Sequence, residues 1–297
     1  MKYALELKNL KKTYPGTQAL KGINLKVKNN SFLALLGKNG AGKSTMIGIL
    51  SYLIKKTSGD TSVMGLDLLK NETKIKSLMG IVPQEVNLHP YDTVLDLLIN
   101  QAGYHGIDRK TAKIRAIEYL KILRLTNKQN SPVISLSGGM KRRAMIARAI
   151  IHNPEIILLD EPTAGVDVEV RAIIWDFLRK LQKNGKTIIL TTHYLEEAEA
   201  LCDTIAVIRS GKIIHQGSMS ETLAKSSDAS LIVDVESNKL AKKDFGEMKN
   251  EVQILKDGRL EFSTKKYSVN EILTKIIKSG LNITNIKKSR SNLEDYL

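Results

Sequence analysis

The chain has 297 residues, of which 42% are hydrophobic, so it can bury one large core or two modest ones and is not disordered by composition. No apolar run approaches the about 20 residues that cross a bilayer, and the single cysteine, Cys202, excludes an internal disulfide and any cysteine-based metal cluster. The net charge of +15 calls for an anionic partner such as a nucleotide, an anionic membrane or a nucleic acid, unless it belongs to a solvated lysine-rich surface.

The first thirty residues contain two stretches in which apolar and polar residues alternate, at 4–7 and 23–28. Such alternation predicts antiparallel strands with one solvated face. The turn Tyr14-Pro15-Gly16 lies between the two stretches and carries an aromatic ring. Tyr14 is either a packing residue or a platform on which a nucleotide base stacks.

A glycine-rich segment, Gly37 to Thr45, fits the phosphate-loop pattern G-x-x-x-x-G-K-[ST]. Its glycines let the backbone curl until the N–H groups face an anion. Lys43 would place a charge at the β- and γ-phosphates, and Ser44 would offer a hydroxyl ligand to Mg²⁺. The apolar run Phe32–Leu36 before the loop predicts a buried strand, and the residues from Ser44 to Leu53 predict a helix whose N-terminus faces the phosphates.

Two short segments with strand character follow the first helix, at 61–64 and 80–84. The second is expected to end at a proline, which leaves Gln84 at the tip of the strand. A glutamine in that place can reach both a metal ion and an attacking water molecule. By its residue type alone, however, Gln84 is an ordinary loop residue.

From residue 87 to about 130 the apolar residues follow helical spacing, which indicates an inserted helical subdomain. Asp108 is the expected N-cap of one of its helices. Lys and Arg are expected on the outer face of that helix. Four apolar residues are expected to share the buried face: Ile114, Ile117, Leu120 and Leu123.

The sequence Leu136-Ser137-Gly138-Gly139 opens another helix, which is expected to run to Ile151. Backbone N–H groups and the helix dipole make Ser137-Gly138-Gly139 a second anion site. The chain therefore has one obvious nucleotide loop but two phosphate-binding devices. A single closed nucleotide site does not explain this mismatch.

The run 156–159 predicts a strand that is buried on both faces and ends in two carboxylates, Asp160 and Glu161. Ligands bind at the ends of parallel strands. Adjacent carboxylates there suit Mg²⁺, because one can face the ion and the other a water molecule. A further buried strand at 187–192 delivers His193 to its end, where it is a candidate ligand of the γ-phosphate.

Residues 228–297 form a separate pattern without a catalytic constellation. A strand at 231–235 is followed by a hairpin signal at Asp257-Gly258. Ser268-x-x-Glu271 is a capping box that begins a helix, and a last strand follows at 281–286. We expect a small α+β module, ferredoxin-like in topology, with a regulatory or dimer-bracing role.

With these motifs in this order, the chain resembles the ATP-binding subunit of an ABC transporter over about residues 4–217. The segment Met140-Lys141-Arg142-Arg143, where many members have glutamine after the glycines, is similar to drug-, polysaccharide- and antibiotic-type (ABC-2) export ATPases, as is the end Ser291–Leu297. The motifs that carry the resemblance are the phosphate loop, Gln84, Leu136-Ser137-Gly138-Gly139, Asp160-Glu161, Asp167 and His193.

The resemblance implies an α/β fold made of a P-loop ABC ATPase domain and a small C-terminal α+β module. The ATPase domain would occupy residues 1–227, with a mixed sheet and an antiparallel β edge. Its inserted helical subdomain would lie at about 87–153. The accessory module would occupy residues 228–297.

The same resemblance assigns roles in ATP hydrolysis. Ser44 and Gln84 would ligate Mg²⁺, with Asp160 acting on it through water. Glu161 would be the general base for the attacking water, oriented partly by His193. Tyr14 would stack on adenine. The implied ATP contacts are Tyr14, Gly37, Asn39, Gly40, Ala41, Gly42, Lys43, Ser44, Thr45, Ser137, Gly138, Gly139 and Asp167, and the implied catalytic residues are Glu161, His193, Gln84 and Lys43.

In this family the Ser137-Gly138-Gly139 site closes on the ATP of a second subunit, so two copies would sandwich two ATP molecules with Asp167 near the crossing. Helices between Gln84 and about Gln101 would contact an integral-membrane permease, with the chain peripheral on the cytoplasmic face of the plasma membrane. The alternative is a soluble ABC ATPase acting on ribosomes or nucleic acid. Such chains carry a second nucleotide loop or a long coiled-coil insertion, so no nucleic-acid partner is expected here.

Overall fold

The computed structural model of the protein describes residues 2–225, 230–236, 248, 251–255, 258–263 and 266–289. The chain forms two compact units that divide after Met219. This division comes earlier in the chain than the boundary between residues 227 and 228 expected from the sequence, which stays a prediction. Asp228, Asp257 and the closing motif Ser291–Leu297 lie outside the described residues.

The alternating stretches near the N-terminus form an antiparallel sheet, as predicted, with strand order β2-β1-β4-β5. Its strands are β1 (Tyr3–Tyr14), β2 (Thr17–Lys28), β4 (Ser58–Val63) and β5 (Leu66–Asp67). One face carries the buried residues Leu5, Leu7 and Leu25, while lysines such as Lys26 and Lys28 point to solvent. Alternation by two residues produces this division because successive side chains leave a strand on opposite faces.

A second, six-stranded sheet has the order β10-β9-β3-β8-β7-β6, and all its strands are parallel except β10 at the edge. Its strands are β3 (Phe32–Leu36), β6 (Met79–Val82), β7 (Ile156–Asp160), β8 (Thr187–Thr192), β9 (Thr204–Arg209) and β10 (Lys212–Ser218). Every residue of β3, β7 and β8 is buried, which explains why these strands are apolar without alternation. Their carboxyl ends meet at one edge of the sheet.

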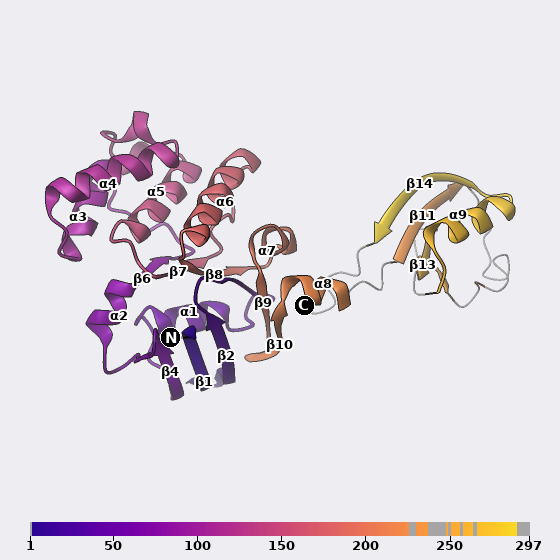
Figure 1. Ribbon diagram of the computed structural model, residues 1–297, viewed down its shortest axis with the longest axis horizontal. Helices are drawn as coiled ribbons and strands as arrows, with labels where there is room; N and C mark the ends of the chain where they lie inside the picture. Colours follow the sequence, from indigo (N-terminus) through magenta and orange to yellow (C-terminus); the bar gives the residue numbers. More distant parts are fainter. Residues whose placement is uncertain are drawn as a thin grey trace. The chain divides into compact units, whose positions relative to one another are not determined.

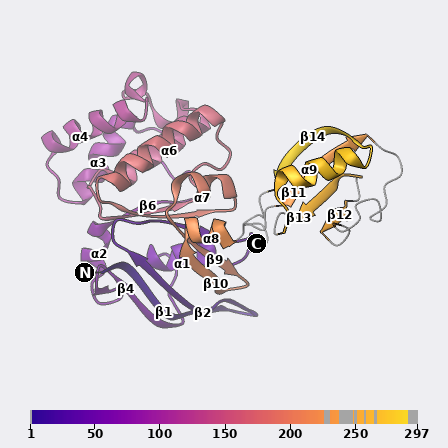
Figure 2. The same cartoon turned by 45° about the vertical axis from the view of Figure 1, so that its right-hand side comes forward.

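The helix α1 (Lys43–Leu50) contacts strands of both sheets (Figure 1). A hydrophobic core of the first unit includes Met46, Ile47 and Leu50 of this helix. That core includes Leu7 and Leu25 from the antiparallel sheet and Leu33 and Leu158 from the parallel one. Figure 2 shows helices on the opposite side of the parallel sheet from the antiparallel sheet. They are α6 (Val168–Lys183) and α7 (Leu195–Leu201), and the short α2 (Glu72–Leu78) precedes β6.

The helix after the phosphate loop is shorter than predicted, because α1 ends at Leu50 and does not extend to Leu53. Tyr52 has a left-handed backbone with φ of 64°, which ends the helix. The N–H of Ile54 then donates to the carbonyl of Gly48 at 2.9 Å. This reversal brings Ile54 onto Gly48, where a Cβ would lie 2.4 Å from Ile54 Cδ1, and leaves Leu53 82% exposed.

The inserted segment is helical from Val94 onward, later than the predicted residue 87, because residues 85–93 are largely loop. Asp108 is the N-cap of the second helix, as predicted, and its Oδ1 accepts a hydrogen bond from the Thr111 N–H at 3.0 Å. The helices are α3 (Val94–Tyr104), α4 (Arg109–Ile122) and α5 (Gly138–Ile150), with short 3₁₀ turns η1 (Thr126–Lys128) and η2 (Val133–Ser135).

The buried face of α4 differs from the predicted one. Ile114 and Ile117 are 61% and 40% exposed, whereas Leu120 and Leu123 are buried as predicted. Ala112 and Ala116 are buried together with Leu120. A spacing of four residues keeps these three on one side of the helix, and the small alanines allow close contact with α3 and α5. From their size the isoleucines are expected to be buried. The alanines are buried in their place because α4 packs closely against its neighbours.

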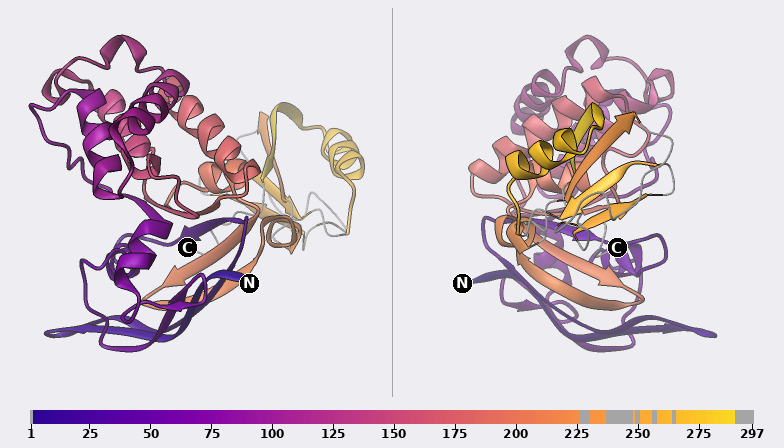
Figure 3. Two further views of the ribbon diagram at one scale, coloured as in Figure 1. Left: turned by 60° about the vertical axis from the view of Figure 1, so that its left-hand side comes forward. Right: turned by 90° about the vertical axis from the view of Figure 1, so that its right-hand side faces the viewer.

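The second unit contains an antiparallel sheet in the order β12-β13-β11-β14, with α9 across one face (Figure 3). The Ser268–Glu271 capping box is present at the start of α9, as predicted. Leu231, Phe262 and Ile276 belong to its own core. Its elements are β11 (Ser230–Glu236), β12 (Val252–Ile254), β13 (Leu260–Ser263), α9 (Val269–Lys278) and β14 (Asn282–Ser289), preceded by α8 (Met219–Lys225).

Within the described part of the chain, no helix has both the length and the apolar character needed to span a membrane. The single cysteine, Cys202, is buried directly after α7, and burial raises the pKa of its thiol well above the ordinary value. It is therefore a packing residue, as the sequence predicts.

Candidate functional site

The phosphate loop joins the end of β3 to the start of α1, and close contacts within the chain require two of its glycines, Gly37 and Gly42. A Cβ at Gly37 would lie 2.5 Å from the carbonyl oxygen of Ile208. A Cβ at Gly42 would lie 2.8 Å from Leu20 Cδ2, and Gly42 also has a φ of 114° that favours glycine. The chain itself therefore fixes the shape of this loop.

Lys43 begins α1 and turns its side chain back over the loop. Its Nζ donates to the carbonyl oxygens of Gly37 at 2.5 Å and Lys38 at 3.3 Å. Burial lowers the pKa of Lys43, while the carboxylates of Glu161 and Asp160 act in the opposite direction. A cavity of about 280 Å³ opens beside it, lined by Ala19, Asn39, Gly40, Gly42, Lys43, Ser44, Thr45, Gln84 and Glu161.

The two carboxylates stand at the end of β7, next to the end of β8. Asp160 is buried, and its Oδ1 accepts a hydrogen bond from the Thr191 hydroxyl. The N–H of Glu161 donates to the carbonyl oxygen of Thr191 at 3.1 Å and to its hydroxyl at 3.2 Å. Glu161 has a left-handed backbone with φ of 47°, which costs about 1–3 kcal/mol for a residue of this type. Strain of this kind is concentrated at functional sites.

Two side chains from different strands hold the Glu161 carboxylate. His193, which follows β8, places its Nδ1 3.1 Å from Glu161 Oε1. Gln84, which follows β6, donates from Nε2 to Glu161 Oε2 at 3.4 Å. Each of the three residues is thus brought to the same edge of the parallel sheet by the end of its own strand. One carboxylate at this edge is available to take a proton from a water molecule in the cavity.

Ser137 is the N-cap of α5, and its hydroxyl accepts a hydrogen bond from the N–H of Met140 at 3.3 Å. A Cβ at Gly138 would meet nothing within 4 Å, so the fold of this chain does not require glycine there. A Cβ at Gly139 would lie 3.2 Å from Val170 Cγ2, a tight contact. Neither glycine nor Ser137 lines the cavity beside Lys43. The Ser137-Gly138-Gly139 turn is therefore not part of the cavity that the phosphate loop lines.

The family of ABC transporters matches residues 20–164. The linearmycin resistance ATP-binding protein LnrL of Bacillus subtilis is 39% identical over 221 residues, which are 74% of this chain and 71% of that protein. Nod factor export ATP-binding protein I of Burkholderia orbicola is 38% identical over 213 residues, 72% of this chain and 70% of that protein. This chain belongs to the ABC transporter family.

Among solved structures, the dimeric post-hydrolysis state of an ATP-binding cassette with ADP and phosphate bound superimposes with a TM-score of 0.67. It is 30% identical, and the match covers 72% of this chain and 98% of that cassette. The first unit is therefore an ABC ATPase domain, and the chain is an ATP-binding, ATP-hydrolysing subunit of the transporter type whose similar relatives include export proteins.

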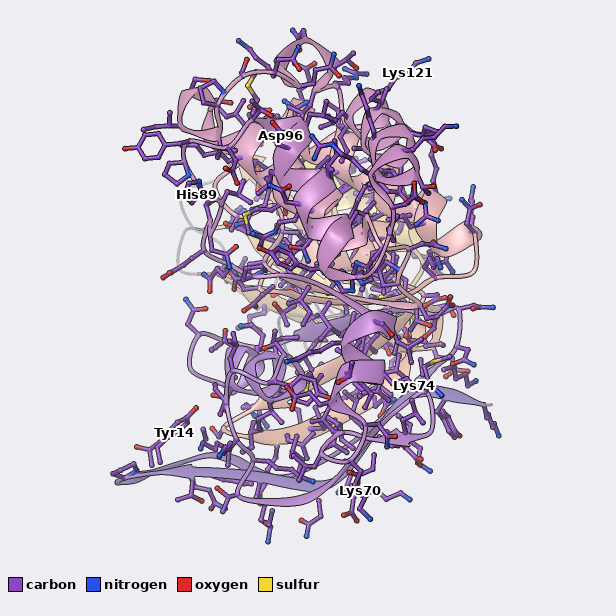
Figure 4. All side chains as sticks on the ribbon, turned by 90° about the vertical axis from the view of Figure 1, so that its left-hand side faces the viewer. Tyr14, Lys70, Lys74, His89, Asp96 and Lys121 are labelled. Carbon is purple, nitrogen blue, oxygen red and sulfur yellow. The ribbon has the colours of Figure 1, made fainter. Side chains whose placement is uncertain are left out.

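Seven residues that the ABC resemblance assigns to nucleotide binding lie outside the cavity lining: Tyr14, Gly37, Ala41, Ser137, Gly138, Gly139 and Asp167. Tyr14 is at the outer end of β1 (Figure 4), and Lys12 Nζ lies 4.6 Å from the centre of its ring. Asp167 is exposed and caps α6, because its Oδ1 accepts a hydrogen bond from the Val170 N–H at 2.8 Å. Both roles stay predictions. Of the residues that the resemblance assigns to the site, the cavity lining includes Asn39, Gly40, Gly42, Lys43, Ser44, Thr45, Gln84 and Glu161.

The residues around the cavity fit a magnesium ion that arrives with a nucleotide. Ser44 is exposed at the cavity, and Gln84 lines it, so a hydroxyl and an amide oxygen are within it. Hard oxygen donors of this kind suit Mg²⁺, which takes only one or two protein ligands when phosphates supply the others. Asp160 is buried behind them, with one oxygen engaged by Thr191.

Two residues that support the site are missing from the sequence prediction. The Thr191 hydroxyl donates to the Asp160 carboxylate and accepts from the backbone N–H of Glu161. A hydroxyl at the end of an apolar strand, two residues before His193, is the signal in the sequence that indicates this role. Arg142 is 5% exposed, and its guanidinium donates to the carbonyl oxygens of Pro83 at 2.8 Å and Gln84 at 2.7 Å. No sequence signal separates Arg142 from its neighbour Arg143, because both lie in one basic run.

Proposed function

We propose that two copies of this chain bind two ATP molecules between them and that closure and reopening of the pair drives a membrane permease. In this arrangement each ATP lies in the phosphate loop of one copy and is covered by Ser137-Gly138-Gly139 of the other. Each copy thus contributes half of each of two ATP sites and contains no complete ATP site. Export is the direction that fits the named relatives.

The observation that carries the proposal is the open space at Gly138. The chain's own packing leaves room for a side chain there, since a Cβ would meet nothing within 4 Å. A close approach by something outside the chain therefore accounts for a glycine at that position. The first turn of α5 offers unpaired backbone N–H groups and the positive end of a helix dipole, which suit a phosphate.

Within one copy, the cavity residues would have separate roles in ATP binding and hydrolysis. Lys43 and the loop N–H groups bind and orient the β- and γ-phosphates. Glu161, held by His193 and Gln84, accepts the proton of the attacking water. Magnesium, bound through Ser44 and Gln84 with Asp160 behind them, would offset negative charge on the phosphates. Tyr14 would stack on adenine, and Asp167 would lie near the crossing of the two copies.

The permease would contact the part of the first unit that follows Gln84. Tyr91 in that loop is 76% exposed, and Figure 4 shows His89 and Asp96 on the outer surface there. An exposed aromatic side chain is typical of a protein contact. The chain would then be peripheral at the cytoplasmic face of the plasma membrane, held by the permease.

The test uses Glu161→Gln, which keeps the shape of the side chain and removes the base. We expect hydrolysis to fall by about 10²–10⁴-fold and ATP with Mg²⁺ to convert the chain from monomer to dimer in size exclusion with light scattering. Adding Gly138→Trp, which should fill the open space on α5, is the matched control and should abolish dimer formation. A Glu161→Gln chain that stays monomeric at saturating ATP would contradict the proposal.

A further inference from the structure

Helix α5 does more than present Ser137-Gly138-Gly139 at its first turn, because two of its arginines also hold the segment that contains Gln84. Arg142 lies one turn further along and binds the carbonyls of Pro83 and Gln84. Arg148, near the other end, donates to the carbonyl oxygen of Asn87 at 2.8 Å and to its Oδ1 at 2.7 Å. The segment from 83 to 87 is therefore fastened to one helix by four hydrogen bonds.

The two hydrogen bonds from Arg142 to the carbonyls of Pro83 and Gln84 fix the direction of the Gln84 side chain. A guanidinium is planar and presents its N–H groups in a rigid fork. Two successive carbonyls bound to one fork fix the planes of both peptide groups and so the direction in which the Gln84 side chain leaves the backbone. That side chain reaches Glu161 at 3.4 Å, at the edge of the cavity.

We propose that Arg142 is a positioning residue that couples the two half-sites of one chain. Nucleotide of the partner bound at the first turn of α5 moves or steadies this helix, and Arg142 transmits the change to Gln84 in the chain's own cavity. The inference rests on the proposed ATP-sandwiched pair. It adds a physical route by which closure over one ATP completes the site around the other.

The position of Arg142 also puts its charge in the field of Asp160 and Glu161. Burial lowers the pKa of Arg142, and these two carboxylates act to raise it. Removing the arginine would therefore change both geometry and electrostatics. Arg142→Lys separates the two effects, because it retains a positive charge but has no planar fork for two carbonyls.

A matched control is next to Arg142 on the same helix. Arg143 is 7% exposed and binds carbonyl oxygens as well, at 2.7 Å to Leu123 and 3.3 Å to Arg124. Its strongest partners lie at the end of α4 and not in the Gln84 segment. Arg143→Met thus removes a buried arginine at a similar cost in stability, but it leaves the hydrogen bonds between Arg142 and the Gln84 segment in place.

The first experiment is a double-mutant cycle between Arg142 and Gln84 on the full chain. Arg142→Met and Gln84→Ala should each lower kcat for ATP by about tenfold or more, with the KM for ATP changed less than about threefold. Combined, they should lower it little further, because Arg142 acts through Gln84. The losses from Arg143→Met and Gln84→Ala should instead multiply. Multiplying losses for Arg142 and Gln84, or full activity of Arg142→Lys, would overturn the inference.

The second experiment does not depend on a measurement of activity. In Glu161→Gln, hydrogen–deuterium exchange at the amides of residues 84–87 should slow at least about fivefold when ATP and Mg²⁺ drive dimer formation. With Arg142→Lys added, this protection should be lost although the dimer still forms. A dimer that forms with unchanged exchange at these amides would refute the coupling alone. Absence of the dimer would refute the proposed function itself.

Discussion

The phosphate loop and the Ser137-Gly138-Gly139 turn are both glycine-rich segments at a helix N-terminus, yet the chain packs around them in different ways. In the loop, Cβ atoms at Gly37 and Gly42 would collide with Ile208 and Leu20, so the fold itself demands glycine. At Gly138 a Cβ would meet nothing. One site is shaped by its own chain, and the other leaves space for something else.

The charged side chains around the two sites follow the same division. Lys43 points into the loop and brings its charge to the cavity. At the other site, the shortest hydrogen bonds of Arg142 and Arg143 are to the backbone carbonyls of Gln84 and Leu123, both outside α5. The α5 turn thus offers backbone N–H groups rather than an ammonium or guanidinium. A site of this kind can cover a phosphate that is already bound elsewhere, which is the role of a half-site.

The largest expected effect comes from Gly42→Ala. The added Cβ would clash with Leu20 and would impose a φ of 114° on a residue with a side chain. We expect loss of measurable ATP binding and about 1–3 kcal/mol of lost stability. A fluorescent ATP analogue and thermal unfolding measure these. Gly106→Ala is the control, because Gly106 also has a positive φ but lies in open space far along the chain from the loop. ATP affinity within a few-fold of the native value in Gly42→Ala would contradict the comparison.

Gly138→Ala should show the opposite combination. Because the space at Gly138 is open and alanine favours a helix, the melting temperature should stay the same or rise slightly. ATP binding to the monomer should be unchanged, while the ATPase rate falls by about 10–100-fold because the extra methyl meets the partner's nucleotide. Gly103→Ala, another glycine of a helix with open space, should gain stability with no loss of rate. Equal ATPase rates in Gly138→Ala and Gly103→Ala would contradict the idea that the open space at Gly138 is reserved for the partner's nucleotide.

The parts of this site that the sequence predicted are those where a local pattern leaves one physical solution. A fully apolar run that ends in Asp160 and Glu161 can only be a buried strand with its carboxylates at the end, and the structure has that strand. The same holds for Asp108 and Ser268, whose side chains accept from the N–H three residues later. Such features depend on neighbours in the chain.

The parts that could not be predicted depend on distant contacts. The end of α1 follows from the left-handed backbone of Tyr52, a residue type that gives no sign of it. The burial of Ala112 rather than Ile114 is decided by how closely α4 packs on its neighbours. Likewise, Arg142 and Arg143 are adjacent and alike, and only the fold determines which of them reaches the Gln84 segment.

Thr191→Val tests how strongly Asp160 and Glu161 depend on Thr191, a residue for which the sequence predicts no role. The hydroxyl donates to the buried Asp160 and accepts from the N–H of Glu161. Its loss should lower kcat by about tenfold and stability by about 1–3 kcal/mol, because two buried polar groups lose a partner. Thr187→Val, at the other end of β8, should cost stability without affecting the rate, since the Thr187 hydroxyl accepts a hydrogen bond from the Asn30 N–H, outside the cavity lining. A normal rate in Thr191→Val would show that Asp160 and Glu161 keep their positions unaided.

The last expected effect is a loss of stability at acid pH, absent at neutral pH, that comes from His152 just beyond the end of α5. His152 stacks on His105 with ring centres 3.7 Å apart, and its Nε2 lies 3.1 Å from the carbonyl oxygen of Met79. Burial, with a smaller contribution from His105, lowers the pKa of His152 from 6.5 to about 4. Between these values the unfolded chain binds a proton that the folded chain does not, so stability falls as the pH drops through this window and levels off below it.

Partial solvation of His152 limits the loss to about 2 kcal/mol at pH 4. His152→Phe keeps an aromatic ring against His105 and removes the titration. Urea unfolding between pH 4 and 7 should therefore show a flatter slope in the variant, whatever constant offset the lost contact with Met79 adds at every pH. If both slopes are equal, acid acts on the chain elsewhere. In that case the contacts of His152 with His105 and Met79 add no pH dependence to the stability of the chain.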